Sequence, residues 1–218
     1  MKKLMIVAAA MLVMFAATAS AQELSGGVKG GMNLASISNM DQEFGRDTDI
    51  KMLPGFYVGA FVEYKLNDRF GISPEFVYSM QGVKAEASGR DEWDGVDYKY
   101  EGKMSLNYLN IPVLAKIYVA ESFSIDVGPQ FGFLLSAKEK DKATYAGQTH
   151  EADEDIKKFC NTFDMALGIG ATYNIGKFMI QGRYNIGITD VAKFEDEKPS
   201  SHKALRNNVF QFGVAYRF

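Results

Sequence analysis

The sequence is poor in the residues on which several common protein chemistries depend. It has a single cysteine, Cys160, so an intramolecular disulfide framework is excluded. No histidine neighbours Cys160, and we therefore expect its thiol to have no catalytic role. Beyond the first 21 residues, no uninterrupted apolar run approaches the roughly 20 residues that a transmembrane helix needs. If this chain enters a membrane, it must do so as strands.

Positive charge is also in short supply. The chain has 24 lysines and arginines against 27 acidic residues. Without Lys2 and Lys3, which belong to the amino-terminal segment, 22 basic residues remain and the formal charge is −5. A mildly acidic chain is a poor match for the phosphate backbone of nucleic acids, so we expect no nucleic-acid partner.

The amino-terminal segment has the pattern of a secretory signal peptide. Two lysines precede an apolar run over 4–15, and the "ASA" of 19–21 fits a small-residue cleavage site. A membrane-anchor helix fits less well, because the run is shorter than the roughly 20 residues that a bilayer requires. We therefore predict a signal peptide over 1–21 and one exported domain over 22–218, a length that suits a single all-β domain or barrel.

The rest of the chain alternates apolar and polar residues with a period of two, as strands with one apolar face do. In the segment 55–66, for example, Phe56, Val58 and Val62 share one face and Glu63 lies on the other. The alternation predicts eight strands, over 26–34, 55–66, 69–82, 105–118, 123–136, 163–173, 178–189 and 208–218.

The connections between these strands alternate in length. Tight turns are expected at 67–68, 120–122 and 174–177, whereas the other links run over 35–54, 83–104, 137–162 and 190–207. An even number of antiparallel strands with short turns at one end and long loops at the other is typical of bacterial outer-membrane barrels. We therefore predict an all-β fold, an eight-stranded antiparallel up-and-down transmembrane β-barrel, with both ends of the chain on the periplasmic side.

A soluble barrel of the lipocalin type is an alternative, since it would alternate too, with its apolar face inside around a ligand. The polar face here is mostly Gly, Ser, Asn, Gln and Ala, which suits a cramped interior better than a water-facing wall. Its few charges have both signs, as burial at low dielectric requires, and predict a lumenal ion-pair network. The members are Lys29, Glu63, Lys65, Glu75, Lys116, Asp126, Asp164, Arg183 and Arg217.

The large apolar face would then point at lipid. Aromatic residues recur at the strand ends and would form girdles at the two membrane interfaces. They are Phe56, Tyr64, Phe70, Tyr78, Phe123, Tyr173 and Phe178. The segment 208–218 fits as the closing strand, which would pair with the first strand and leave no sheet edge in the hydrocarbon.

Five blocks of the sequence resemble the PorT-like outer-membrane β-barrel family. They are "GVKGGMNLA" (27–35), "NYLNIPVLAKI" (107–117), "DVGPQFGFLLS" (126–136), "FDMALGIGATYNIG" (163–176) and "RYNIGITD" (183–190). The ordered set spans essentially the whole exported chain, and the resemblance implies a small outer-membrane barrel. PorT itself is associated with a protein-secretion system, so a secretion-accessory role is also implied. The aromatic pair Tyr216 and Phe218 resembles the signal that the outer-membrane assembly machinery recognises.

Some small outer-membrane barrels are lipid-modifying enzymes, so acyl transfer or deacylation is the main alternative function. A serine nucleophile needs a histidine within reach and a carboxylate that orients it. The two histidines, His150 and His202, both fall in predicted exterior loops, and no positioned triad can be traced. We assign no catalytic residue, and we expect neither enzymatic activity nor a cofactor.

Two charged segments of the loops could suggest further sites. The segment 90–102 gathers four acidic residues around Gly95, but it lacks the oxygen spacing of an EF-hand loop. We interpret it as a solvated loop and predict no metal site. The segment 151–159 is expected to form a short amphipathic helical turn that orders its loop.

A general diffusion pore is the remaining alternative. Large aqueous channels belong to barrels of roughly 16 strands or more, whereas a barrel of eight is filled by its own side chains. We therefore expect a binding or structural role carried by the four long loops, since loops on a rigid scaffold commonly carry recognition. The expected partners are outer-membrane lipid, the assembly machinery during biogenesis, and a surface or secretion-system protein.

Overall fold

The computed structural model describes residues 24–40, 48–90, 96–194 and 202–218. The predicted signal peptide over 1–21 lies outside the described residues. In the described part of the chain, no helix is long and apolar enough to span a membrane.

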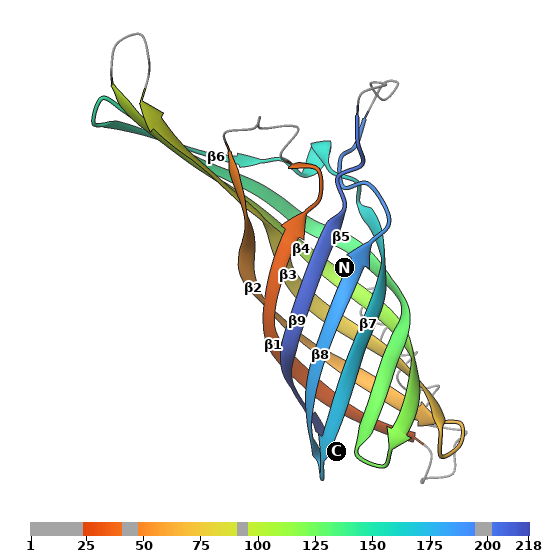
Figure 1. The fold of residues 1–218 in the computed structure, drawn as a ribbon. Helices are drawn as coiled ribbons and strands as arrows, with labels where there is room; N and C mark the ends of the chain where they lie inside the picture. Colours follow the sequence, from red (N-terminus) through yellow and green to blue (C-terminus); the bar gives the residue numbers. More distant parts are fainter. Residues whose placement is uncertain (1–23, 41–47, 91–95, 195–201) are drawn as a thin grey trace.

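The described residues form nine strands and one short turn of 3₁₀ helix. They are β1 (Leu24–Ile37), β2 (Asp49–Lys65), β3 (Phe70–Arg90), β4 (Asp97–Ala120), β5 (Phe123–Tyr145), β6 (Gln148–Asp155), η1 (Lys157–Phe159), β7 (Phe163–Ile175), β8 (Phe178–Gly187) and β9 (Asn207–Arg217). All except β6 pair in the order β4-β3-β2-β1-β9-β8-β7-β5, and β4 pairs with β5 to close the ring (Figure 1). The predicted eight-stranded antiparallel barrel is confirmed.

The first and last strands of the ring meet along a long antiparallel seam. β1 pairs with β9 from Gly27 opposite Arg217 to Ile37 opposite Asn207. Gly213 lies in the middle of this seam, and a Cβ atom there would stand 2.3 Å from the carbonyl oxygen of Gly30 and 2.5 Å from the Tyr57 hydroxyl. A glycine at this position therefore lets the two backbones and the lumenal Tyr57 pack together.

The two faces of the wall have opposite polarity. Inside, the buried side chains include many that are charged or carry amides, such as Glu63, Glu75 and Asn33. Outside, large apolar side chains such as Phe212 and Val214 are exposed around the ring. The soluble-carrier alternative is therefore wrong, because it requires the apolar face to lie inside.

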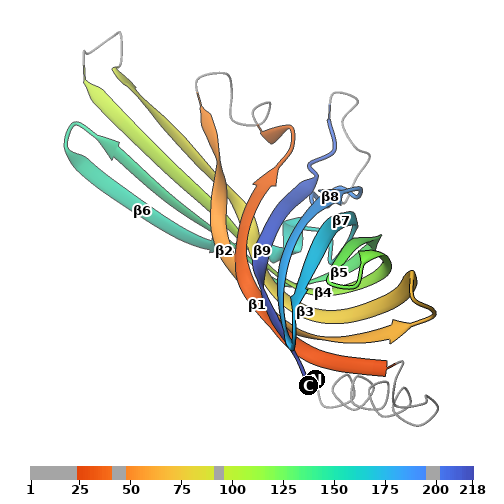
Figure 2. The ribbon, with the colours of Figure 1, turned by 60° about the horizontal axis from the view of Figure 1, so that its bottom comes forward.

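Two segments that were expected to be loops are largely strand. β3 continues to Arg90 and β4 begins at Asp97, so most of 83–104 is paired, and β5 and β6 form a hairpin within 137–162. These extensions, together with the start of β2, form a sheet of five strands that we call the arm. It consists of 49–52, 83–90, 97–104, 138–145 and 148–155. The arm leans away from the barrel axis (Figures 1 and 2).

The arm was missed because one of its faces is a run of charges and the other carries small residues and tyrosines in place of large apolar side chains, so its segments have the composition of solvated loops. They are held instead by backbone pairing and by charges across strands, such as Lys140 with Asp153 at 2.8 Å and Lys142 with Glu151 at 3.1 Å. For the same reason the helical turn expected over 151–159 is wrong in its first part. Residues 151–155 belong to β6, and the 3₁₀ turn covers Lys157–Phe159 alone.

We expect Gly213→Ala to destabilise the barrel, because the added carbon meets backbone atoms of β1 that cannot move without disturbing the seam. Overpacking of this kind typically costs about 1–3 kcal/mol. The measurement is the urea midpoint of the purified barrel refolded in detergent. Gly182→Ala is the matched control, since a Cβ atom at Gly182 meets nothing within 4 Å. Equal midpoints for the two variants would contradict the tight seam.

Candidate functional site

The middle of the lumen holds a buried ion cluster around Glu75. Its carboxylate accepts hydrogen bonds from Lys29 Nζ at 2.9 Å and from both terminal nitrogens of Arg183, at 2.7 and 2.9 Å. All three side chains are buried, and they come from β1, β3 and β8. A bidentate arginine and a lysine together satisfy both carboxylate oxygens, which is the condition for burying such charges at tolerable cost.

A second cluster lies around Lys116 on β4. Its Nζ is 3.3 Å from a Glu63 oxygen and 3.4 Å from Asp126, and Arg217 donates to the other Glu63 oxygen at 3.0 Å. Asp126 also accepts a hydrogen bond from Thr172 at 2.5 Å. The chain of charges therefore continues towards the short-turn end of the barrel, with the signs alternating.

The other two predicted members lie apart from these clusters. Lys65 is exposed at the end of β2, and its ammonium stands 4.8 Å from the centre of the Tyr118 ring. Asp164 is buried at the start of β7 and accepts a hydrogen bond from Thr189. The structure thus places Lys65 outside the buried network, because the strand has already reached the open end of the barrel there.

A layer of neutral amides, which the search for charges overlooked, completes the lumen. Asn185 donates to Gln211 at 3.1 Å, Gln211 donates to Asn33 at 3.1 Å, and Asn33 donates to Ser79 at 2.8 Å. The alternation of polar residues could have identified this amide layer, since its members share the face that carries the charges.

Little empty space remains beside these groups. A cavity next to Lys29 measures about 10 Å³, which is about the space of one water molecule.

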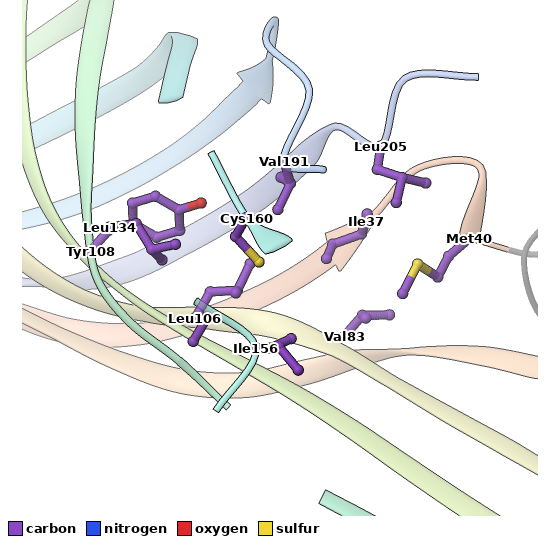
Figure 3. Close-up of a cluster of buried hydrophobic side chains, with 11 residues drawn as sticks. Ile37, Met40, Val83, Leu106, Tyr108, Leu134, Ile156, Cys160, Val191 and Leu205 are labelled. Carbon is purple, nitrogen blue, oxygen red and sulfur yellow. The ribbon is translucent and has the colours of Figure 1, made fainter. Parts of the chain in front are cut away.

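An apolar cap closes the mouth of the barrel at the arm end. It consists of Ile37, Met40, Val83, Leu106, Tyr108, Leu134, Ala137, Ile156, Cys160, Val191 and Leu205 (Figure 3). Segments from β1, β3, β4, β5 and the links outside the strands all contribute to it. Burial raises the pKa of the Cys160 thiol to about 11, so the thiol stays protonated and packs as an apolar side chain.

The arm has two different faces. On one face, Lys51, Lys84, Lys103 and Lys140 are direct cross-strand neighbours. The next row outward is mainly acidic, with Asp49, Glu86, Glu101, Lys142 and Glu151 side by side. Hydrogen bonds from Lys51 and Lys84 lower the pKa of Glu86 to about 2, so the two rows hold each other in the ionised state.

The opposite face of the arm carries tyrosines among small residues. Tyr98 and Tyr145 are paired across β4 and β5, and their exposed fractions are 37% and 43%. The Tyr98 ring covers Gly89, where an added Cβ atom would meet its hydroxyl at 2.8 Å. The Tyr100 hydroxyl donates to Asp141 at 2.6 Å, and partial burial together with this carboxylate raises the pKa of Tyr100. At the base of the arm the face continues into the apolar cap.

The two histidines lie on different elements. His150 is exposed on β6. His202 Nε2 is 2.9 Å from an Asp190 oxygen, and its ring packs edge-on against Phe194 at 4.6 Å. Asp190 also accepts hydrogen bonds from the backbone N–H groups of Ala192 and Leu205, both at 3.1 Å, so this pair ties together the connection between β8 and β9.

The structure supplies no metal ligand set in the described ranges. No group of three or more His, Cys, Asp or Glu side chains is placed there to hold a metal ion. Of the four acidic residues around Gly95, only Asp97 belongs to the described residues, at the start of β4.

The aromatic pair at the end of the chain lies at the short-turn end of the barrel. The Tyr216 ring packs against Phe178 at 5.2 Å and against Phe218 at 6.1 Å. The backbone N–H of Phe218 donates to the Gly26 carbonyl at 3.0 Å. The last residue is thus held by the sheet while its side chain stays 74% exposed.

We expect Arg183→Leu to destabilise the barrel by about 3 kcal/mol, because it leaves Glu75 buried with only Lys29 as a charged partner. The urea midpoint of the refolded protein measures this loss. Arg206→Leu makes the same chemical change at an exposed position and is expected to have little effect. If both variants unfold at the wild-type midpoint, the Glu75 cluster contributes nothing to stability.

Residues 18–193 of the chain match the sequence model of the family described as "Outer membrane protein beta-barrel domain". No curated protein matches the sequence.

Among solved structures, the chain is similar to Ail, the attachment invasion locus protein of Yersinia pestis, in complex with the heparin analogue sucrose octasulfate. The identity is 15%, 90% of this chain and 100% of that chain are covered, and the TM-score is 0.41. Neisserial surface protein A is 11% identical over 89% of this chain and 97% of its own, with a TM-score of 0.36. OprG from Pseudomonas aeruginosa is 12% identical over 89% and 94%, with a TM-score of 0.35.

Proposed function

The chain belongs to the outer-membrane protein β-barrel domain family and is a protein of the bacterial outer membrane. On that premise we propose that it is a sealed barrel that carries a binding arm. The observation behind this proposal is the continuity of β3, β4 and β5, which run without interruption from the barrel into the arm. A segment rooted in this way is held rigid by the barrel, and rigid presentation lowers the entropic cost of binding.

The filled lumen favours binding over transport. The Glu75 and Lys116 clusters occupy the interior, and the apolar cap lies over its mouth. A solute that crossed would have to displace buried, mutually paired charges, which is expensive because each charge would lose its partner in a low-dielectric setting. The filled interior thus suits a structural scaffold better than a transport channel.

The tyrosine face of the arm is the surface that we assign to the partner. Tyr98 and Tyr145 stand exposed beside one another, and the Tyr98 ring lies flat enough to cover Gly89 on the neighbouring strand. Tyrosines combine a large apolar area with a polar tip and are enriched at the energetic centres of interfaces. The partner class is a protein or other component of the cell surface.

We also propose that the protein is not an enzyme. The proposal is supported by the structural use of His202, which Asp190 and Phe194 hold within a connection, and by the exposed position of His150 on the arm. The alternative, a lipid-modifying activity, would change the acylation of lipid A when the protein is expressed, and mass spectrometry of extracted lipid A distinguishes the two.

The resemblance to PorT-like proteins leads to a narrower proposal, a secretion-accessory role. Crosslinking in the native outer membrane tests it directly. Recovery of secretion-machinery subunits on the barrel would support this role, and capture of abundant surface components alone would count against it.

We expect the double substitution Tyr98→Ala and Tyr145→Ala to reduce crosslinking to the native partner by at least about tenfold, since central interface tyrosines typically contribute 1–2 kcal/mol or more each. The measurement is the yield of the specific crosslinked band in native outer membranes. Lys99→Ala with Lys142→Ala is the matched control, because these lysines lie on the same two strands and on the opposite face. Equal yields for the two double variants would remove the tyrosine face from the proposal.

We propose that Tyr216 and Phe218 are the signal for the assembly machinery, and the 74% exposed Phe218 side chain supports this role. Removing Phe218 is expected to lower the yield of folded protein in the outer membrane several-fold, as judged by heat-modifiable migration on gels. Removing a comparable exposed aromatic from the wall, by Phe70→Ala, controls for loss of lipid contact. A normal yield without Phe218 would show that the signal lies elsewhere.

A further inference from the structure

A hollow of about 730 Å³ lies beside the start of β7, at the arm end of the barrel. Three lysines line it, together with polar and aromatic residues. These are Lys157, Lys158, Lys193, Asn161, Thr162 and Phe163, and Cys160 also contributes to the lining. Among the residues that the structure describes, none of those lining the hollow carries a carboxylate. This described lining therefore concentrates positive charge, in a chain with an acidic balance overall.

Two segments that are distant in sequence hold the hollow in shape. The backbone N–H of Lys193 donates to the Phe159 carbonyl at 2.8 Å, and the backbones of Cys160 and Ala192 form an isolated antiparallel β-bridge. The Asn161 side chain donates to the carbonyls of Asp190, at 2.8 Å, and Ala192, at 2.9 Å. The η1 turn and the link after β8 are thus tied together, so the lysines are positioned before any ligand arrives.

Two of the lysines are oriented by uncharged groups. Lys157 Nζ donates to the Leu135 carbonyl at 2.8 Å, and Lys158 Nζ lies 4.6 Å from the centre of the Phe159 ring. Among the described residues, the carboxylate of Asp155 accepts a hydrogen bond from the backbone N–H of Lys157 at 2.9 Å and leaves the ammonium group to other partners. Lysines of the arm differ, because Lys140 and Lys142 are paired with Asp153 and Glu151. In the described part of the chain the ammonium groups of Lys157 and Lys158 thus contact uncharged partners and remain available to an anion.

The hollow also adjoins the lipid-facing wall. Phe159 and Phe163 have exposed fractions of 58% and 44%. The Phe163 ring packs against Phe131 at 6.5 Å and against Phe133 at 5.7 Å, and these rings belong to the apolar exterior of the barrel. Lysines beside exposed aromatic rings at the rim of the wall match the chemistry of the membrane interface, where charged headgroups meet acyl chains.

We propose that this hollow is a binding site for the phosphorylated headgroup of a membrane lipid. The phosphate lies among Lys157, Lys158 and Lys193, and the acyl chains lie along Phe159 and Phe163. A lipid is the source of the phosphate because a free anion would gain nothing from the exposed rings. The site is separate from the tyrosine face of the arm and holds whether or not that face binds a partner.

The test uses the full exported chain, refolded in an uncharged detergent, with dioleoyl phosphatidic acid as the probe and native mass spectrometry as the readout. Replacing Lys157, Lys158 and Lys193 together by glutamine is expected to weaken lipid binding roughly fivefold per lysine, on the order of a hundredfold in total. The matched control replaces Lys99, Lys140 and Lys142 of the arm by glutamine, which removes the same charge and is expected to change binding less than about twofold.

Three further measurements keep the outcome clear. Replacing the same three lysines of the hollow by arginine retains the charge and should retain binding, which separates loss of the site from loss of the fold. Dioleoyl phosphatidylcholine should bind at least about tenfold more weakly than phosphatidic acid. Inorganic phosphate, at the concentration of the lipid probe, should not displace the lipid.

The proposal is overturned if the arm variant loses binding as strongly as the hollow variant, because the attraction would then be a property of the whole surface. It is also overturned if the two lipids bind equally, or if inorganic phosphate competes at the same concentration as the lipid. The last result would make the hollow a site for soluble anions.

Discussion

Backbone hydrogen bonding is the constraint on which the rest of this structure depends. Hydrocarbon offers no partner to a peptide N–H or C=O, so a strand exposed to lipid must find both partners in neighbouring strands. The seam between β1 and β9 meets this requirement by closing the sheet. With eight strands in the ring, the enclosed space is narrow, and the side chains of the wall must fill it.

The filling of the lumen follows from this narrowness. Glu75 is tolerated in the interior because Lys29 and Arg183 bind both of its oxygens, whereas Glu63 has one hydrogen bond from Arg217 and a looser ion pair with Lys116. The amide layer around Asn33 and the apolar cap continue the same packing towards the mouth. A barrel built in this way is rigid, and its rigidity is what allows four of its strands, β2 to β5, to continue into the arm.

The same strands change their chemistry where they leave the wall. Within it, one face must be apolar because it meets lipid, and alternation follows. Beyond it, both faces of the arm meet water, so the strands are stabilised by backbone pairing and by cross-strand charges such as Lys142 with Glu151. Between these two regimes lies the rim, where the exposed Phe163 and the three lysines of the hollow stand together. The closed barrel thus carries two different surfaces, the tyrosine face on the arm and the lysine-lined hollow at the rim.

The sequence by itself determined the eight strands of the barrel and the direction in which each face points. Both follow from a period-two alternation that lipid imposes along each strand, so the signal is local and can be seen without knowing any pairing. The arm was harder to recognise, because its alternation sets charges such as Lys84 and Glu101 against small residues and tyrosines and so resembles a solvated loop until the strands are paired. The tertiary structure also decided which charges meet. Glu75 and Arg183 are 108 residues apart, and their contact depends on the stagger between strands around the ring, as does the exposure of Lys65 at its open end. Alternation specifies a face, whereas the choice of partner on that face depends on the register, which is a property of the closed barrel as a whole.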